Sequence, residues 1–172
     1  WTIFSKIYGL VFGLLQRAFK LSTIVTNSKY NALHIKKRFN NRISVIHPPV
    51  KIAQAPRAMG KKENLVITIS RISQKKNLGI IIKVARYLRD EEYKFIIAGN
   101  VLNEYELHLL DKKIEEYKLS NIEIIKDPTY STLRELMSRA TVYLSGQQTE
   151  AFGMALVEAM SFGCIPVVPK SG

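Results

Sequence analysis

Cysteine is almost absent from this sequence of 172 residues, which contains a single one. An internal disulfide bond is therefore excluded, and with it the small secreted folds that depend on a disulfide framework. Cys164 lies in an apolar run, which favours an inert core residue over a nucleophile. Hydrophobic residues make up 47% of the chain, which is enough for a packed core and excludes an intrinsically disordered chain.

Groups that bind metals are also scarce. The sequence has no Asp-x-Asp pair, and its three histidines lack the spacing of zinc ligands. No serine, histidine and acid are placed as a catalytic triad. We therefore expect no metal site and no covalently bound cofactor. The three histidines are His34, His47 and His108.

Long hydrophobic runs are missing too. A transmembrane helix needs about 20 apolar residues, whereas the uncharged stretch at residues 7–16 has only ten. It belongs to Ile3–Leu21, where small and polar residues recur every three or four positions and predict a mostly apolar helix with a narrow polar stripe. Two interpretations stay open: this helix packs on a domain outside the sequence, or it lies in a membrane interface. Because Trp1 is not an initiator methionine, we expect the natural chain to begin upstream.

Acidic residues are absent from residues 1–60, which hold ten Lys or Arg. Residues 61–172 hold sixteen basic and fourteen acidic residues and are nearly balanced. A basic block beside a balanced one indicates a face that meets an anionic surface, and charge alone fits nucleic acid or an anionic membrane. No basic motif interleaved with aromatic residues supports nucleic acid. We therefore expect no nucleic acid partner and retain an anionic membrane surface.

The basic part of the chain is predicted to contain little regular structure. A strand is expected at Thr23–Thr26, and Asn27 or Ser28 can cap a helix at Lys29–Phe39. A second strand is expected at Ile43–Ile46, and the prolines after it end regular structure.

A domain boundary is predicted at Lys51–Lys62, where the sequence KIAQAPRAMGKK has no clear periodicity. We interpret residues 51–62 as a linker. Residues 1–50 would be the end of an N-terminal domain with a basic interdomain segment, and residues 63–172 would be a second domain.

Residues 63–172 alternate short apolar strands with amphipathic helices. This pattern predicts an α/β fold: a Rossmann-like parallel sheet with helices on both faces. Because such sheets bind ligands at the carboxyl ends of their strands, the residues that follow each strand are the functional candidates. The expected strands are 65–69, 95–98, 122–125, 141–144 and 165–168, and the expected helices are 78–88, 103–117, 132–137 and 153–161.

Two glutamates eight residues apart form the strongest candidate site. Glu150 is expected in a loop after a strand, and Phe152–Met154 at the start of the next helix, whose free backbone N–H groups can bind a phosphate or a sugar hydroxyl. Gly153 permits close backbone approach. Glu158 is the only polar side chain in the run Met154–Met160. Because burying a lone carboxylate is costly, its position favours a role such as binding a ribose diol.

Two cations follow the first strand of this domain. Arg71 comes directly after it, and Lys76 follows five residues later. Cations at the carboxyl end of a strand suit a pyrophosphate, whose negative charge grows as its bond to a sugar breaks. Lys75 is expected to face solvent. Gly99, at the end of the next strand, is a further candidate for ligand binding.

Four segments of the chain, taken in order, carry a recognisable set of motifs. They are NSKYNALHIKKRF (Asn27–Phe39), VIHPPV (Val45–Val50), SRISQKKNL (Ser70–Leu78) and TEAFGMALVEAMSFGCIPVV (Thr149–Val168). Together they resemble the retaining family 4 glycosyltransferases of the GT-B fold, and are similar to lipid-linked-oligosaccharide mannosyltransferases. The resemblance covers nearly the whole chain and implies the C-terminal half of a GT-B fold with a short lead-in.

The resemblance also implies roles for the candidate residues. Residues 63–172 would be the nucleotide-sugar-binding domain, truncated at its C-terminal end. The donor would be a nucleotide sugar, a GDP- or UDP-sugar, bound without a metal. In that family the residues corresponding to Arg71 and Lys76 hold the donor diphosphate. The glutamate corresponding to Glu150 faces the donor sugar, and that corresponding to Glu158 holds the ribose. Backbone amides around Phe152–Met154 contact the sugar and the phosphate.

The chain departs from the family pattern in two places. The family often has Pro-Ser shortly before the first glutamate, whereas this chain has Ser145–Thr149 with the sequence SGQQT. The sequence also ends at Gly172, where the family usually continues, and most of an N-terminal domain with its acceptor site is absent. We therefore expect this chain alone to lack transfer activity.

The resulting prediction is a glycosyltransferase that moves a sugar, with mannose as one candidate, to a lipid-linked or polysaccharide acceptor with retention of configuration. A cytoplasmic location, peripheral on the cytoplasmic membrane face, is expected. Two alternatives stay open: a nucleotide-sugar-binding module without activity, and a GT-B phosphorylase. The phosphorylase would need a pyridoxal-binding lysine region, which the sequence present does not contain.

Overall fold

The computed structural model describes residues 10–11, 13–14, 17, 23–38, 42–52 and 61–170. The chain divides into two compact units, Trp1–Pro49 and Val50–Gly172. Most of the predicted helix Ile3–Leu21 and most of the predicted linker lie outside the described residues. Within the described part of the chain, no helix has the length and apolar character needed to cross a bilayer.

Within residues 23–38 and 42–49, the first unit contains two short parallel strands and the helix between them. Strand β1 (Ile24–Thr26) pairs with β2 (Ile43–Val45), with Ile24 opposite Ile43, and helix α2 (Lys29–Lys36) connects them. The Ser28 side chain caps α2, because its Oγ accepts a hydrogen bond of 3.1 Å from the backbone N–H of Asn31. The expected cap is confirmed at Ser28, and the helix ends earlier than predicted.

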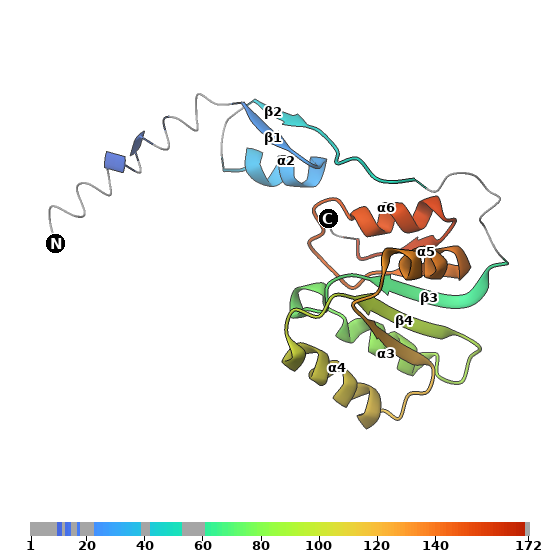
Figure 1. The fold of residues 1–172 in the computed structure, drawn as a ribbon. Coiled ribbons are helices and arrows are strands. Elements are labelled where there is room, and N and C mark those ends of the chain that lie inside the picture. Colours follow the sequence, from blue (N-terminus) through green and yellow to red (C-terminus); the bar gives the residue numbers. More distant parts are fainter. Residues whose placement is uncertain are drawn as a thin grey trace, which may run out of the picture. The chain divides into compact units, whose positions relative to one another are not determined.

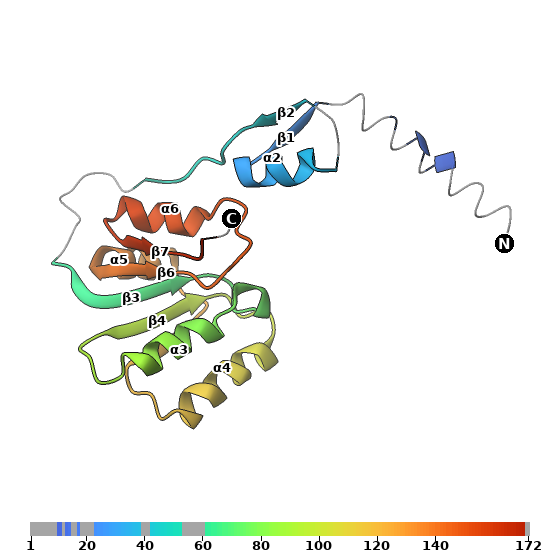
Figure 2. The ribbon, with the colours of Figure 1, turned by 180° about the vertical axis from the view of Figure 1, so that it is seen from behind.

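The second unit is a five-stranded parallel sheet with the strand order β5-β4-β3-β6-β7 (Figures 1 and 2). Its helices lie between successive strands, as the alternating sequence pattern predicts. The strands are β3 (Glu63–Ile69), β4 (Lys94–Gly99), β5 (Ile122–Lys126), β6 (Ala140–Leu144) and β7 (Ile165–Val167). The helices are η2 (Gln74–Lys76, a 3-10 turn), α3 (Gly79–Tyr87), α4 (Glu104–Glu116), α5 (Tyr130–Arg139) and α6 (Met154–Ser161).

Two hydrophobic clusters lie on opposite faces of the sheet. One is formed with α3 and α4 and contains Ile81, Phe95 and Leu107, while the other is formed with α5 and α6 and contains Met137 and Phe162. Each such side chain contributes about 1.5–3 kcal/mol when it is fully buried. The predicted Rossmann-like α/β fold with helices on both faces is therefore confirmed, and Figure 1 shows α5 and α6 together on one face.

Two local features differ from the sequence prediction. Helix α5 is longer than the expected 132–137, because the Oγ1 of Thr129 caps it by accepting the N–H of Thr132 at 3.2 Å. A 3-10 turn at Gln74–Lys76 was not predicted. It ends in Asn77, which has a left-handed backbone (φ 50°) and turns the chain into α3.

The strand order reverses at β3. From β3 the chain builds outward through β4 to β5, then crosses back to place β6 on the other side of β3. In open parallel sheets, ligands bind at the carboxyl ends of the two strands where the order reverses. The residues that follow β3 and β6 are therefore the first place to look for a site.

Candidate functional site

Lys76 and Glu150 meet at this reversal of the strand order. Lys76 ends the turn η2 after β3, and Glu150 lies in the loop after β6. The ammonium Nζ of Lys76 lies 3.2 Å from Oε2 of Glu150, and the two side chains are 21% and 35% exposed. The Lys76 ammonium also donates to Oε1 of Gln147. The sequence named both charged partners but did not single out Gln147, whose only signal is its place in the same loop.

The loop after β6 packs tightly against the turn after β3. Asn77 Nδ2 donates to the carbonyl of Gly146 at 3.1 Å. A Cβ added at Gly146 would lie 2.4 Å from Cγ2 of Ile80, so no larger residue fits without movement. This close contact holds the loop that carries Gln147 and Glu150 against the turn that carries Lys76.

Two side-chain hydrogen bonds join the ends of β3 and β6. Thr68 Oγ1 donates to the carbonyl of Leu144 at 2.6 Å, and the Tyr143 hydroxyl donates to the carbonyl of Ile69 at 2.9 Å. Burial raises the pKa of Tyr143 well above its ordinary value, so the hydroxyl remains a donor over the physiological range. The strand ends on which the site is built are thereby fixed to each other.

Arg71 and Gly99 behave differently from the other candidates. The Arg71 side chain is exposed, and within the described part of the chain it makes no hydrogen bond or ion pair, so its guanidinium is available to an anion. Gly99 is buried, and a Cβ added there would lie 1.6 Å from the carbonyl oxygen of Ser70. Gly99 therefore lets the end of β4 approach the chain after β3, a steric role that the sequence did not predict.

Helix α6 begins beside Glu150 without a side-chain cap. Gly153 precedes it with a left-handed backbone (φ 78°), which explains why glycine is needed there. Oε1 of Glu150 accepts the backbone N–H of Ala151 at 3.1 Å, which orients the carboxylate next to the helix start. The positive end of the helix dipole at Met154 adds to the attraction for an anion. Phe152 lies in the same loop and is half-buried.

Glu158 lies on α6 and contacts α5. The hydroxyl of Tyr130, the first residue of α5, donates to Oε1 of Glu158. This hydrogen bond to a carboxylate raises the pKa of Tyr130 above its ordinary value. Glu158 is half-buried, and sequence reasoning missed Tyr130 because the two residues are 28 positions apart.

Metal ligands do not gather in the described residues. None of the groups of His, Cys, Asp and Glu within 23–38, 42–52 and 61–170 is arranged to hold a metal ion. The cations near the strand ends are Arg71 and Lys76, and side chains of these two types can form charge-assisted hydrogen bonds to phosphate oxygens.

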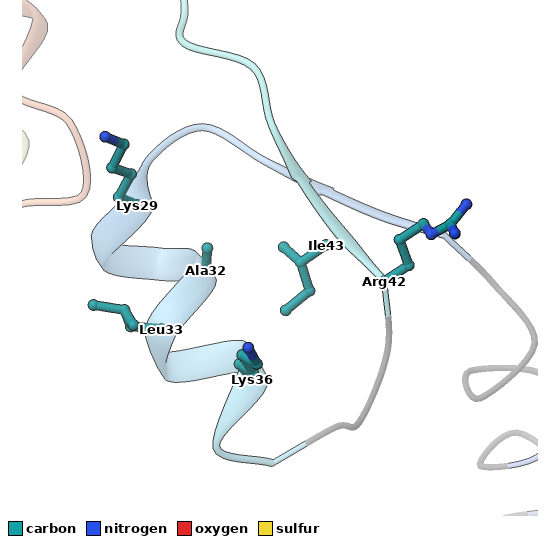
Figure 3. A pocket seen from close by; sticks show the side chains of 6 residues that line it. All are labelled: Lys29, Ala32, Leu33, Lys36, Arg42 and Ile43. Carbon is teal, nitrogen blue, oxygen red and sulfur yellow. The ribbon is translucent and has the colours of Figure 1, made fainter.

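The first unit carries a hollow of about 500 Å³ between α2 and β2. Apolar Ala32 and Ile43 line it together with Lys29, Lys36 and Arg42, and Figure 3 shows Ile43 between the helix and the strand, with Lys29 and Arg42 extending away from it. Leu33 is 61% exposed on the same helix. The hollow therefore combines an apolar floor with three cations, and all of its residues come from the basic block of the sequence.

The sequence matches a known family over most of its length. Residues 51–172 match the family described as Glycosyl transferases group 1. Because the match spans more than half of the chain and includes the whole strand-reversal site, the chain belongs to this family. The predicted glycosyltransferase family is thereby confirmed.

Two curated proteins and one solved structure show what the chain is similar to. It is 24% identical over 205 residues to a GDP-Man:Man(3)GlcNAc(2)-PP-Dol alpha-1,2-mannosyltransferase of Neurospora crassa, covering 100% of this chain and 36% of that protein. It is 30% identical to a GDP-mannose:cellobiosyl-diphosphopolyprenol alpha-mannosyltransferase of Xanthomonas campestris, covering 95% of this chain and 45% of that protein. The crystal structure of TarM superposes with a TM-score of 0.76 and 25% identity, covering 90% of this chain and 31% of TarM. The chain therefore spans less than half the length of these curated relatives.

Proposed function

We propose that residues 63–172 form the donor-binding domain of a retaining mannosyltransferase that uses GDP-mannose and a lipid-linked acceptor. Residues 1–50 would be the end of the N-terminal domain, and residues 51–62 the linker. The single observation that carries the proposal is the meeting of Lys76 and Glu150 at the carboxyl ends of β3 and β6, beside the start of α6. The choice of GDP-mannose and of the acceptor class rests on the names of the two curated relatives.

The donor diphosphate would lie against Lys76 and Arg71, with the uncapped N–H groups at the start of α6 behind it. Lys76 is half-buried and held in place by two partners, whereas Arg71 is exposed and able to move onto a ligand. Negative charge on the diphosphate grows as the bond to the sugar breaks. Fixed cations at that position therefore stabilise the transition state more than the bound donor.

The two glutamates would have different tasks. Glu158 would accept the hydroxyl hydrogens of the ribose. Glu150, next to the start of α6, would face the donor sugar. The acceptor would then attack on the face from which the nucleotide leaves, which retains the configuration. These two roles keep the nucleotide fixed while the sugar carries the developing charge.

Calorimetric titration of the chain with GDP, UDP and GDP-mannose, in buffer with a metal chelator, tests this proposal. We expect GDP to bind without metal and more tightly than UDP. We expect Glu158→Gln to weaken GDP binding by about tenfold or more, because a hydrogen bond to a charged group contributes about 1.5–3 kcal/mol. A matched control is Glu123→Gln, an exposed glutamate on β5 with no partner in the described residues. Loss of all nucleotide binding in the chelator would refute the proposal.

We also propose that the first unit contacts an anionic membrane surface. The hollow between α2 and β2 supports this, because Lys29, Lys36 and Arg42 surround an apolar floor. Each basic residue near an anionic bilayer adds about 1 kcal/mol to binding. Membrane binding would bring a transferase that acts on a lipid-linked acceptor close to the surface that carries the acceptor.

Co-sedimentation with vesicles tests this second proposal. We expect the chain to sediment with phosphatidylserine-containing vesicles and not with neutral phosphatidylcholine vesicles. The variant with Gln at Lys29, Lys36 and Arg42 should bind at least about tenfold more weakly. A control with the same change in charge has Gln at Lys83, Lys112 and Lys118, three exposed lysines of the second unit. Equal loss in both variants would show that only net charge matters and would contradict the proposal.

A further inference from the structure

Tyr130 is the only described side chain that donates a hydrogen bond to the Glu158 carboxylate. The two residues lie on neighbouring helices, since Tyr130 begins α5 and Glu158 is in the middle of α6. Figure 2 shows these helices on the same face of the sheet. The contact therefore bridges two elements that come from distant parts of the domain.

The position of Tyr130 is fixed by the segment before it. Asp127, in a left-handed conformation (φ 44°), donates its backbone N–H to the carbonyl of Gly99 at 3.0 Å. Its carboxylate Oδ1 accepts the N–H of Val101 at 3.1 Å, and Thr129 caps α5. The start of α5 is thereby attached to the end of β4. A tyrosine at this place can hold Glu158 in one orientation without being buried, which suits its exposed fraction of 43%.

The hydrogen bond leaves most of the carboxylate available. The Tyr130 hydroxyl uses one hydrogen-bond acceptor site of Oε1, and Oε2 of Glu158 has no partner in the described part of the chain. An ionised carboxylate accepts about four hydrogen bonds in total. Both hydroxyl groups of a ribose can therefore bind Glu158 while Tyr130 stays in place.

We propose that Tyr130 is a positioning residue that holds the Glu158 carboxylate ready for the 2′- and 3′-hydroxyl groups of the donor ribose, and so sets the preference for ribonucleotides. This inference rests on the proposed donor site and adds to it a residue that acts through Glu158. A glutamate side chain held in one rotamer loses less entropy when the ribose binds. Removing the hydroxyl of Tyr130 should therefore weaken the binding of ribonucleotides and leave the binding of analogues without the diol unchanged.

The test measures binding of GDP and 2′,3′-dideoxy-GDP to the whole chain by calorimetry. We expect Tyr130→Phe to weaken the binding of GDP by about threefold to tenfold, the effect of losing one hydrogen bond of ordinary strength. The binding of dideoxy-GDP should weaken by less than about twofold. Adding Tyr130→Phe to Glu158→Gln should cause little further loss, because the two residues act together. Tyr105→Phe is the matched control, since Tyr105 is 64% exposed on α4. Thermal melting should show that Tyr130→Phe is folded like the unaltered chain, because the variant keeps the ring at a position that is 43% exposed, and unchanged binding of dideoxy-GDP would show the same.

The outcomes separate this inference from the proposed function. If Glu158→Gln weakens GDP binding but Tyr130→Phe does not, the inference is wrong and the proposed donor site stands. If Tyr130→Phe weakens the binding of GDP and of dideoxy-GDP equally, the inference is also wrong, because the hydroxyl would then act elsewhere. If Tyr130→Phe binds GDP more tightly, the inference is wrong because the hydroxyl would then compete with the ribose. If the unaltered chain does not bind GDP, or if Glu158→Gln binds it normally, both the donor site and the inference fail.

Discussion

The ammonium of Lys76 lies 3.2 Å from Oε2 of Glu150 and joins the loops at the carboxyl ends of β3 and β6. Both side chains are partly exposed, so the pair itself contributes only about 0–1 kcal/mol to stability. In the proposed donor site, a diphosphate would replace Glu150 as the partner of Lys76, because it carries more negative charge than one carboxylate. The pair would then hold the cation in place without blocking the donor.

Replacing Lys76 should therefore affect ligand binding more than folding. We expect Lys76→Met to weaken GDP binding by about tenfold or more, because a charge-assisted hydrogen bond contributes about 1.5–3 kcal/mol. Lys75→Met is the matched control, since Lys75 lies in the same turn and its side chain is exposed. Calorimetry should show less than about twofold change for the control. Similar losses for both variants would mean that general charge, rather than a specific contact, attracts the nucleotide.

Glu150→Gln should separate donor binding from catalysis. The variant frees Lys76 from a competing carboxylate, so GDP should bind the chain as well as before or slightly more tightly. In a longer protein with the acceptor domain, the same change should lower kcat more than donor affinity, because the proposed contact to the sugar strengthens in the transition state. Binding titrations and steady-state kinetics measure the two effects. Weaker GDP binding with unchanged kcat would reverse the roles assigned to the two glutamates.

Gly99 should tolerate no side chain. A Cβ there would lie 1.6 Å from the carbonyl of Ser70, so Gly99→Ala must push apart the ends of β3 and β4 and should cost about 1–3 kcal/mol of unfolding free energy. Gly79→Ala, at the start of α3, has its nearest contact at 3.7 Å and should be neutral or stabilising by up to about 1 kcal/mol. Urea unfolding of the two variants measures the difference, and similar stabilities would contradict the steric argument.

Lys62 should be a structural residue although the sequence assigns it to a linker. Its ammonium donates to three backbone carbonyls at 2.7–3.1 Å, those of Met137, Ala140 and Phe162, which lie where α5 and α6 end. Lys62→Met leaves these acceptors without the cation and should cost about 2–4 kcal/mol of unfolding free energy, given the strength of hydrogen bonds to charged groups. Lys61→Met is the exposed neighbour and should change stability by less than about 0.5 kcal/mol in urea unfolding. Equal stabilities would show that water replaces the ammonium without loss.

Sequence patterns predicted the strands and helices well because hydrophobic periodicity is a local property. They also placed Lys76 and Glu150 at the correct edge of the sheet, since residues that follow parallel strands share one edge. They could not pair Tyr130 with Glu158 or Lys62 with the carbonyl of Phe162, because those contacts depend on strand order and helix packing. The role of Gly99 was hidden for the same reason, since its restriction comes from Ser70 on a neighbouring strand end.

Acid should remove the contribution that Glu63, at the start of β3, makes to the stability of the fold. Two nitrogens of the Arg139 guanidinium bond its carboxylate at 2.7 and 3.1 Å, and this hydrogen bonding holds the pKa of Glu63 below its ordinary value. A lowered folded-state pKa adds stability above the unfolded pKa of about 4.3, and that stability is lost as the pH falls through the folded value. Glu63→Gln should therefore be less stable than the unaltered chain at neutral pH, with a difference that disappears in acid. Urea unfolding at several pH values measures this difference. A difference that persisted after Glu63 is fully protonated would mean that the side chain acts through packing rather than charge.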